Sequence, residues 1–322
     1  MPRTWQPLTE AAPEAVPSSE VAVVVPAHNA EATIKGTLTS VADQTGPPGE
    51  VIVVDDGSTD RTAEIAEATG ATVVRRSSSG GPSAARNDGC AAAGRTWIAL
   101  LDADDRWHPE KLERQLQACA MEPSAVAIAS DWVRETREPW AASPAQPSGT
   151  WIEYHDLMIM NRFQTSTVLV RKRALDEVGG FHSSLDGVED WDCWLRLSRL
   201  GPVLKLDWPY VRYADTPGGV SKDLRRIYDR MWGMLEREVR SGATCLDEKE
   251  VRSLLAWHHL RFATNWLLVG DRAEALRVGR RLWADGLTGA APRATVVHLA
   301  PFLWGRARRR LPGATGSRAI QP

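Results

Sequence analysis

The chain has few cysteines, no long apolar run and almost no net charge. Its four cysteines lie far apart and form no CxxC pair, so we expect reduced core thiols in a cytoplasmic protein. No apolar run is as long as a membrane span. The formal net charge of −2 over 322 residues gives the whole chain no attraction to nucleic acid.

Two motifs of common α/β enzymes are also missing. No GxGxxG follows the first apolar run at residues 21–25, which argues against a dehydrogenase that binds a dinucleotide. Asp55 and Asp56 follow the second such run, but with Gly57 and Ser58 they do not have the DxDx[ST] spacing of a haloacid-dehalogenase-like phosphatase.

What is present is a regular alternation of apolar runs and helical patterns. Strands are predicted at 21–25, 51–54, 72–74, 97–101, 125–130, 165–171 and 210–213. Helices are predicted at 30–42, 61–69, 83–93, 109–121, 189–200, 250–269 and 273–284, and a loop at 134–150. Strands that alternate with helices over short connections predict an α/β doubly wound sheet.

Three carboxylates, Asp102, Asp104 and Asp105, follow the strand predicted at 97–101. Like charges this close repel each other and require a counter-charge. Mg²⁺ or Mn²⁺ would supply it, because these ions prefer oxygen ligands and bridge carboxylates to phosphates. The alternative is a solvated acidic turn. Residues 26–29 and 55–60 also follow strands, so the three segments are predicted to meet at one edge of the sheet.

The composition divides the chain into three parts. Residues 1–20 are polar and rich in Pro and Ala, which predicts a disordered leader. Residues 21–221 carry the alternating pattern, and residues 222–322 are predicted to form a helical extension with a basic tail. From residue 271 to the end, ten Arg stand against three acids, a local charge of +7.

Five motifs occur in an order and spacing that resemble glycosyltransferase family 2. They are Val-Val-Pro-Ala-His-Asn at 24–29, Val-Val-Asp-Asp-Gly-Ser-Thr-Asp at 53–60, Ala-Ala-Arg-Asn-Asp-Gly at 84–89, Leu-Asp-Ala-Asp-Asp at 101–105 and Glu-Asp-Trp-Asp-Cys-Trp-Leu-Arg at 189–196. The resemblance implies a GT-A fold over residues 21–221, a Rossmann-like nucleotide-binding mixed sheet flanked by helices. Residues 21–105 would form its nucleotide-binding half and residues 106–221 its acceptor half.

The resemblance also implies an activity. Family members are inverting enzymes, so the chain would transfer a sugar from a UDP- or dTDP-linked donor, with Mn²⁺ or Mg²⁺, to a hydroxyl of a saccharide, lipid-linked or natural-product acceptor. The alternative is a catalytically impaired protein that only binds a sugar nucleotide. Its support is the segment before Val220 and Ser221, where many members carry Arg and His and this chain has Ala214 and Thr216. Arg212 or Lys222 is a candidate replacement.

The resemblance assigns site residues by motif. Donor-nucleotide contacts fall on Pro26, Ala27, His28, Asn29, Asp55, Asp56, Arg86, Asp102, Ala103 and Asp104. The metal falls on Asp104 and Asp105, and the general base on Asp190, with Asp192 as runner-up. Acceptor contacts fall on Gln164, Thr165, Glu189, Trp191, Asp192 and Trp194.

Three plainer interpretations of these residues remain open. Carboxylates favour a helix N-terminus, so the acids of 189–192 could simply stabilise the start of a helix. Trp191 and Trp194 have the spacing of core residues, and Arg86 could be a surface cation. Beyond the enzyme segment, the apolar residues 301–304 precede Arg306, Arg308, Arg309 and Arg310. This pattern is typical either of peripheral contact with an anionic membrane or of a solvated basic tail.

Overall fold

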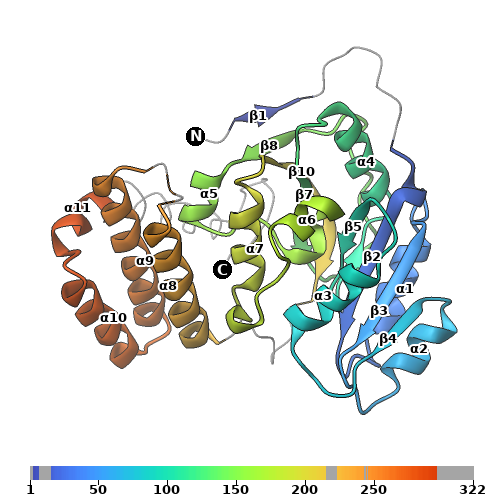
Figure 1. Cartoon of the computed structure of the whole chain (residues 1–322), viewed down its shortest axis with the longest axis horizontal. Coiled ribbons are helices and arrows are strands. Elements are labelled where there is room, and N and C mark those ends of the chain that lie inside the picture. The colour runs from blue at the N-terminus through green and yellow to red at the C-terminus, as the bar shows by residue number, and fades with distance from the viewer. Residues whose placement is uncertain (1–2, 7–15, 215–222, 243, 245, 296–322) are drawn as a thin grey trace. The chain divides into compact units, whose positions relative to one another are not determined.

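The computed structural model describes residues 3–6, 16–214, 223–242, 244 and 246–295. These residues fall into two compact units that divide between Asp223 and Leu224. The first unit contains a sheet with helices packed against it, and the described part of the second consists of helices and their connections (Figure 1). The predicted basic tail after residue 295 lies outside the described residues, as do residues 215–222.

The sheet of the first unit is mixed. Its strands are β1 (Thr4–Trp5), β2 (Val21–Ala27), β3 (Glu50–Asp55), β4 (Thr72–Arg75), β5 (Trp97–Leu100), β6 (Arg106–Trp107), β7 (Ala127–Arg134), β8 (Gly149–Ile152), β9 (Leu169–Arg171) and β10 (Val203–Tyr213). They are ordered β1-β8-β10-β7-β9-β5-β2-β3-β4, with β6 paired to β10. Strands β5, β2, β3 and β4 run parallel, and β9 is antiparallel to both β5 and β7. The predicted mixed sheet is therefore confirmed.

The sequence explains why the central strands are buried. β2 reads Val-Ala-Val-Val-Val-Pro-Ala, and its first five side chains have no exposed surface. A strand that is apolar at every position is covered on both faces, as in parallel sheets with helices on either side. The helices of this unit are α1 (Ile34–Ala42), α2 (Thr62–Ala68), α3 (Pro82–Ala92), α4 (Lys111–Met121), α5 (Tyr154–Ile159), α6 (Lys172–Glu177) and α7 (Glu189–Leu197).

Four segments differ from the sequence prediction. Thr4–Trp5, predicted as disordered, pair as β1 with β8, and Trp5 is 5% exposed. Gly149–Ile152, at the end of the predicted loop, form β8, which is antiparallel to β10. Residues 165–167 form the short 3-10 helix η2 (Thr165–Thr167) rather than the start of a strand, and β10 begins at Val203. The strands β1, β8 and the start of β10 depend on pairing between distant segments, which local periodicity does not encode.

The second unit contains α8 (Leu224–Arg240), α9 (Glu248–Leu268), α10 (Arg272–Ala284), the 3-10 helix η5 (Thr288–Ala290) and α11 (Ala291–Ala294). Helix α9 starts at a capping box, in which the Asp247 side chain accepts a hydrogen bond from Glu250 N–H at 2.7 Å and Glu250 accepts one from Asp247 N–H at 3.1 Å. Within the described residues, no helix is long and apolar enough to cross a membrane.

Helix α3 packs closely on β2 and β3 at Gly89. A Cβ atom at this position would overlap Val24 Cγ1 and lie 3.0 Å from Val54 Cγ2. Both valines are fully buried, so neither can move aside without disturbing the sheet. The glycine therefore sets how closely α3 approaches the sheet.

We predict that Gly89→Ala lowers the free energy of unfolding by about 1–3 kcal/mol, the usual range for an overpacked core. Urea unfolding followed by circular dichroism measures it. Gly94→Ala is the matched control, because a Cβ there meets only Glu50 Oε2, at 4.0 Å. Equal stability of the two variants would show that the α3 contact is not tight.

Candidate active site

The loops that follow β2 and β3 are joined by hydrogen bonds. His28 Nδ1 donates to the Asp56 carbonyl oxygen at 2.8 Å. The Asn29 N–H donates to Ser58 Oγ at 2.9 Å, and Asn29 Oδ1 accepts from the Thr59 N–H at 2.9 Å. Asn29 has a φ of 49°, a left-handed conformation that Asn tolerates better than most residues. The structure thus brings together the two loops predicted to contact a nucleotide.

Asp55 and Asp56 are both buried but have different partners. The Asp56 carboxylate accepts hydrogen bonds from Ser79 Oγ at 2.8 Å and from the N–H groups of Gly80 and Gly81, each at 2.9 Å, and it pairs with Arg76 Nε at 2.7 Å. Burial alone would raise the pKa of Asp56, but these donors together lower it below its usual value. Asp56 therefore anchors the loop before α3.

The Asp55 carboxylate is much less engaged. Among the described residues it accepts one hydrogen bond, from the Ser58 N–H at 3.2 Å. An ionised carboxylate has about four acceptor positions on its two oxygens. Asp55 thus keeps acceptor positions for a ligand, whereas those of Asp56 are occupied by protein donors.

Asp105, the third acid after β5, is held inside the protein. It has no exposed surface, and it accepts hydrogen bonds from Ser166 Oγ and from the Ala214 N–H at 2.9 Å. The same Ser166 Oγ accepts the Asp102 N–H at 3.0 Å, so it fixes both ends of the acidic turn. Burial and the charges of Asp102 and Asp104 raise the pKa of Asp105 well above its usual value.

This geometry does not support Asp105 as the leading metal ligand. Both of its oxygens already accept protein donors, whereas Asp104 makes no ion pair with any described residue. Burial, followed by the nearby charge of Asp102, raises the pKa of Asp104 to about 6. The described residues contain no group of three or more His, Cys, Asp or Glu side chains placed to hold a metal ion. Any cation at this turn would therefore depend on Asp104 and Asp102 and on further oxygens from a ligand.

Arg86 connects the acidic turn to the start of α7. Its Nη2 lies 2.7 Å from Asp102 Oδ1, and its Nη1 lies 2.8 Å from Glu189 Oε1. The Arg86 side chain is only 6% exposed, and its guanidinium carbon lies 5.5 Å from the centre of the Phe181 ring. Although burial opposes the charge, the two carboxylates raise the pKa of Arg86. The surface-cation interpretation is therefore wrong, and the immediate partners of Arg86 are carboxylates.

Asp190, the second residue of α7, accepts hydrogen bonds on both of its carboxylate oxygens. Its Oδ2 accepts from Asn161 Nδ2 at 2.9 Å, and its Oδ1 accepts from the Trp191 N–H at 2.6 Å. Burial and the charge of Glu189 raise the pKa of Asp190 to about 7. The helix N-cap position is Val188, which has no side-chain capping bond. Asp190 would therefore gain and lose its proton near neutral pH, while its bond to the Trp191 N–H also stabilises the start of α7.

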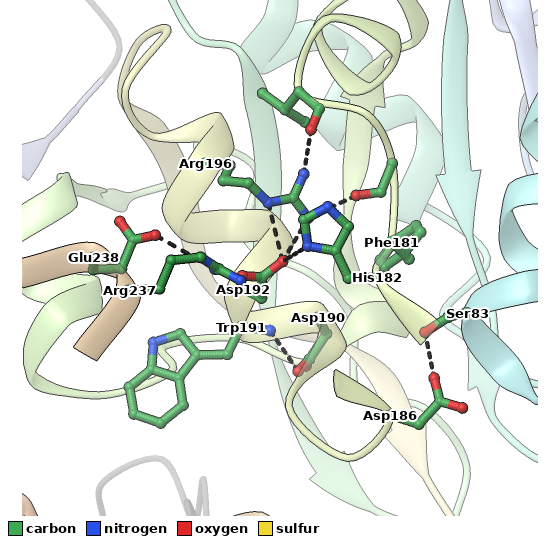
Figure 2. A network of polar contacts seen from close by, with 12 residues as sticks. Ser83, Phe181, His182, Asp186, Asp190, Trp191, Asp192, Arg196, Arg237 and Glu238 are labelled. Atoms are coloured by element: carbon green, nitrogen blue, oxygen red, sulfur yellow. Dashed lines mark hydrogen bonds and ion pairs between the residues drawn. The ribbon is translucent and has the colours of Figure 1, made fainter. Parts of the chain in front are cut away.

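Asp192, the predicted runner-up base, is neutralised by basic neighbours. Figure 2 shows Arg196 and His182 directed at its carboxylate; Arg196 Nη2 and Nε lie 2.7 and 3.0 Å from Asp192 Oδ2, and His182 Nδ1 lies 3.0 Å from it. Asp192 has no exposed surface. Because Arg196 and His182 occupy this buried carboxylate, the structure argues against this assignment and against an acceptor role for Asp192.

The two tryptophans predicted to contact the acceptor are core residues. Trp191 is 4% exposed and donates its Nε1–H to the Leu157 carbonyl oxygen at 2.6 Å. Trp194 has no exposed surface and packs against Phe163 and Phe181. Neither indole presents a face to a sugar ring, so these predictions do not hold, and the core interpretation is correct. Of the remaining acceptor candidates, Thr165 is 5% exposed within η2, and Gln164 is partly exposed just before it.

Sequence reasoning missed three positioning residues. Ser166 holds Asp105 and Asp102, Asn161 holds Asp190, and Arg76 holds Asp56. No local pattern marks them, because each acts on a carboxylate from another segment. Arg212, a candidate replacement for the missing family residues, instead lies over the Trp140 ring at 3.9 Å and donates to the Glu138 carbonyl oxygen at 2.6 Å. The other candidate, Lys222, and the altered position Thr216 lie outside the described residues.

The mixed sheet, with acidic groups gathered beyond the carboxyl ends of its central strands, defines a GT-A glycosyltransferase fold. Residues 22–175 match the family model of glycosyl transferase family 2.

Similar proteins agree with this assignment. The putative teichuronic acid biosynthesis glycosyltransferase TuaG of Bacillus subtilis is 39% identical over 102 residues, which cover 30% of this chain and 40% of TuaG. The chain spans 61, 40 and 39% of the first three curated relatives that it matches.

Two solved structures share the fold. The S. aureus TarS 1-349 structure in complex with UDP-GlcNAc has a TM-score of 0.64 and 21% identity, with 86% of this chain and 83% of that chain covered. The mannosyltransferase PcManGT from Pyrobaculum calidifontis has a TM-score of 0.59 and 20% identity, with 92% of this chain and 86% of that chain covered.

We predict that Asp104→Asn raises the stability of the protein at pH 8 more than at pH 5. The folded-state pKa of about 6 lies above the ordinary value of 3.8, so ionisation of Asp104 costs the fold stability as pH rises through this interval. Thermal unfolding of both forms at the two pH values, without divalent cations, measures the effect. Asp43→Asn, on an exposed residue away from the site, is the control. A gain that is equal at both pH values would contradict the raised pKa.

Proposed function

We propose that the protein is an inverting glycosyltransferase that uses a nucleotide-diphosphate sugar, with UDP or dTDP as the nucleotide, and a hydroxyl-bearing saccharide, lipid-linked or natural-product acceptor. The observation that carries this proposal is that Arg86 joins two sets of acids through its ion pairs with Asp102 and Glu189. Asp102 belongs to the acidic turn, which we assign to the donor and a cation. Glu189 precedes Asp190, whose pKa is about 7. The teichuronic acid context of TuaG and the UDP-GlcNAc bound by TarS support the proposal.

The nucleotide would contact the joined loops after β2 and β3. Uracil and thymine each carry one ring N–H donor, and the ribose or deoxyribose carries hydroxyl donors. Asp55 can accept from such groups because only one hydrogen bond from a described residue occupies it. Pro26, Ala27, His28 and Asn29 would form the wall beside it, held in place by the contacts to residues 56–59.

The acidic turn would hold Mn²⁺ or Mg²⁺. The donor set fits such an ion, because Asp104 is a partly buried carboxylate without a cationic partner among the described residues, and it lies two residues from Asp102. PcManGT was solved with GDP-Man and Mn²⁺, which supports the same assignment here. When bound, such a cation neutralises charge that develops on the departing diphosphate. Arg86 orients Asp102 toward this place and thereby shares in donor binding.

Asp190 would remove the proton from the acceptor hydroxyl as the new bond forms. A pKa of about 7 leaves it largely ionised at slightly alkaline pH and still basic enough to take a proton. Asn161 would hold Oδ2 in place, and the Arg86–Glu189 pair would set the start of the helix that carries Asp190. Gln164 and Glu189 remain the candidates to border the acceptor.

We predict that Mn²⁺ raises the affinity for UDP and that Asp104→Asn removes most of this increase. Loss of one of two carboxylate ligands should lower the metal-dependent affinity by about tenfold or more, which corresponds to about 1.4 kcal/mol or more. Isothermal titration with UDP in Mn²⁺ and in EDTA gives the measurement, and Asp43→Asn again serves as control. Equal UDP affinity in Mn²⁺ and EDTA for the unmodified protein would remove the metal from the proposal.

We predict that Asp190→Asn keeps UDP affinity but lowers sugar transfer by a factor of about 10² or more, the usual size of a general-base contribution. Release of UDP from UDP-glucose and UDP-GlcNAc, with water or added sugars as acceptor, is the readout. Asn161→Ala removes a hydrogen bond that favours the ionised form of Asp190. In the unmodified protein, the acid limb of the kcat/KM profile should lie near pH 7. In Asn161→Ala, it should move to higher pH.

Two other outcomes would have distinct meanings. Near-normal turnover of Asp190→Asn would exclude Asp190 as the base. Tight UDP binding without turnover of any sugar nucleotide by the unmodified protein would favour the impaired binding protein instead.

A further inference from the structure

Exposed apolar side chains are concentrated in the second unit. The described residues include six large apolar side chains that are strongly exposed, and five of them lie between residues 267 and 283. The five are Leu267 at 59%, Leu268 at 63%, Val269 at 69%, Leu276 at 62% and Trp283 at 75%. Single exposed apolar residues are ordinary on protein surfaces, but a gathering of this kind marks an interaction site.

Helix α10 sorts its side chains onto two faces. Leu276, Arg280 and Trp283 follow one another at spacings of four and three residues, so they share one face, and Arg272 lies four residues before Leu276 on the same face. We call Arg272, Leu276, Arg280 and Trp283 the α10 face; the exposed Leu267, Leu268 and Val269 precede this helix in the chain.

The opposite side of α10 packs on the helices of its own unit. Arg277 Nη1 lies 3.0 Å from Asp229 Oδ1, and Arg277 also pairs with Glu274. The Arg281 guanidinium lies 5.1 Å from the centre of the Trp232 ring. These two arginines therefore have partners inside the unit.

The arginines of the α10 face differ from these two. Arg272 and Arg280 are exposed and make no ion pair with any described residue. The nearest acids along the chain are already engaged: Asp271 accepts the Glu274 N–H at 3.1 Å, and Asp285 lies 3.8 Å from Arg281 Nε. The face thus combines unpaired positive charge with exposed leucine and tryptophan, and it belongs to a segment, 271–322, with ten Arg and three acids.

We propose that the α10 face binds the surface of an anionic lipid bilayer. A helix of 13 residues is about 20 Å long and can lie in the plane of the headgroups, where leucine and tryptophan enter the acyl boundary. The long stems of Arg272 and Arg280 allow their guanidinium groups to reach lipid phosphates. This deepens the proposed function, since it would bring the enzyme to lipid-linked acceptors.

A second copy of the chain is a poorer occupant of the same face. In a two-fold symmetric dimer each residue faces the same patch of its partner. The face would then meet an identical face that carries the same two arginines and no acid to balance their charge, which opposes association. Charge complementarity therefore favours an anionic surface over self-association.

Co-sedimentation of the full chain with vesicles tests the proposal. We expect binding to vesicles of phosphatidylcholine with phosphatidylglycerol, weaker binding to phosphatidylcholine alone, and loss of binding as salt is raised. Arg272→Glu with Arg280→Glu, and separately Leu276→Ser with Trp283→Ser, should each lower the partition coefficient by about tenfold or more. Arg173→Glu and Leu200→Ser, exposed positions in the first unit, are the matched controls and should bind normally.

Both double variants keep residues 301–310. Unchanged vesicle binding by them would overturn the proposal and assign any binding to other segments, as would binding that does not distinguish the two vesicle types. Loss of a dimer in light scattering upon Leu276→Ser with Trp283→Ser, without a change in vesicle binding, would show that the face joins two copies. UDP affinity in Mn²⁺, measured on the same preparations, tests the proposed enzyme function separately, and we expect it to be unchanged in all four variants.

Discussion

The buried ion pairs of Arg86 set the electrostatics of the candidate site. One guanidinium serves two carboxylates, Asp102 at 2.7 Å and Glu189 at 2.8 Å, from segments far apart in the chain. Removing Arg86 would leave both carboxylates without their counter-charge, which is costly. The same arrangement leaves the neighbouring acids Asp104 and Asp190 without a cation of their own, and both have raised pKa values. The proposed chemistry would use Asp104 to bind a cation and Asp190 as the base.

A common plan underlies the three acidic motifs. In two of them, one carboxylate is bound by several protein donors and its neighbour keeps acceptor capacity: Asp56 is bound by Arg76 and the loop at 79–81 beside Asp55, and Asp105 by Ser166 and Ala214 beside Asp104. In the third, Asp192 is bound by Arg196 and His182, whereas Asp190 accepts hydrogen bonds only from Asn161 and the Trp191 N–H. The anchored acids hold the backbone in place, and this positions the others without a change in total charge.

The arginines of helix α10 fall into two groups, one packed inside the second unit and one exposed on its surface. Arg277 and Arg281 cover the rings of Tyr228 and Trp232, where their charge is balanced by Asp229, Glu274 and Asp285. Arg272 and Arg280, on the same helix, make no ion pair with any described residue and share a face with the exposed Leu276 and Trp283.

The sequence alone determined the central part of the fold. Continuous apolar runs such as residues 21–25 are buried on both faces, and a strand-ending acidic motif lies at an edge of the sheet wherever the sheet is parallel. These features depend on residues that are close together in the chain, so the sequence pattern predicts them. The motif order also indicated glycosyltransferase family 2 before any contact was known. Tertiary structure alone decided which acid of each motif is anchored, that Trp191 and Trp194 are core residues, and that β1 and β8 extend the sheet. The physical reason is separation along the chain: Ser166 reaches Asp105 across 61 residues and Arg86 reaches Glu189 across 103, and such contacts leave no periodicity in the sequence.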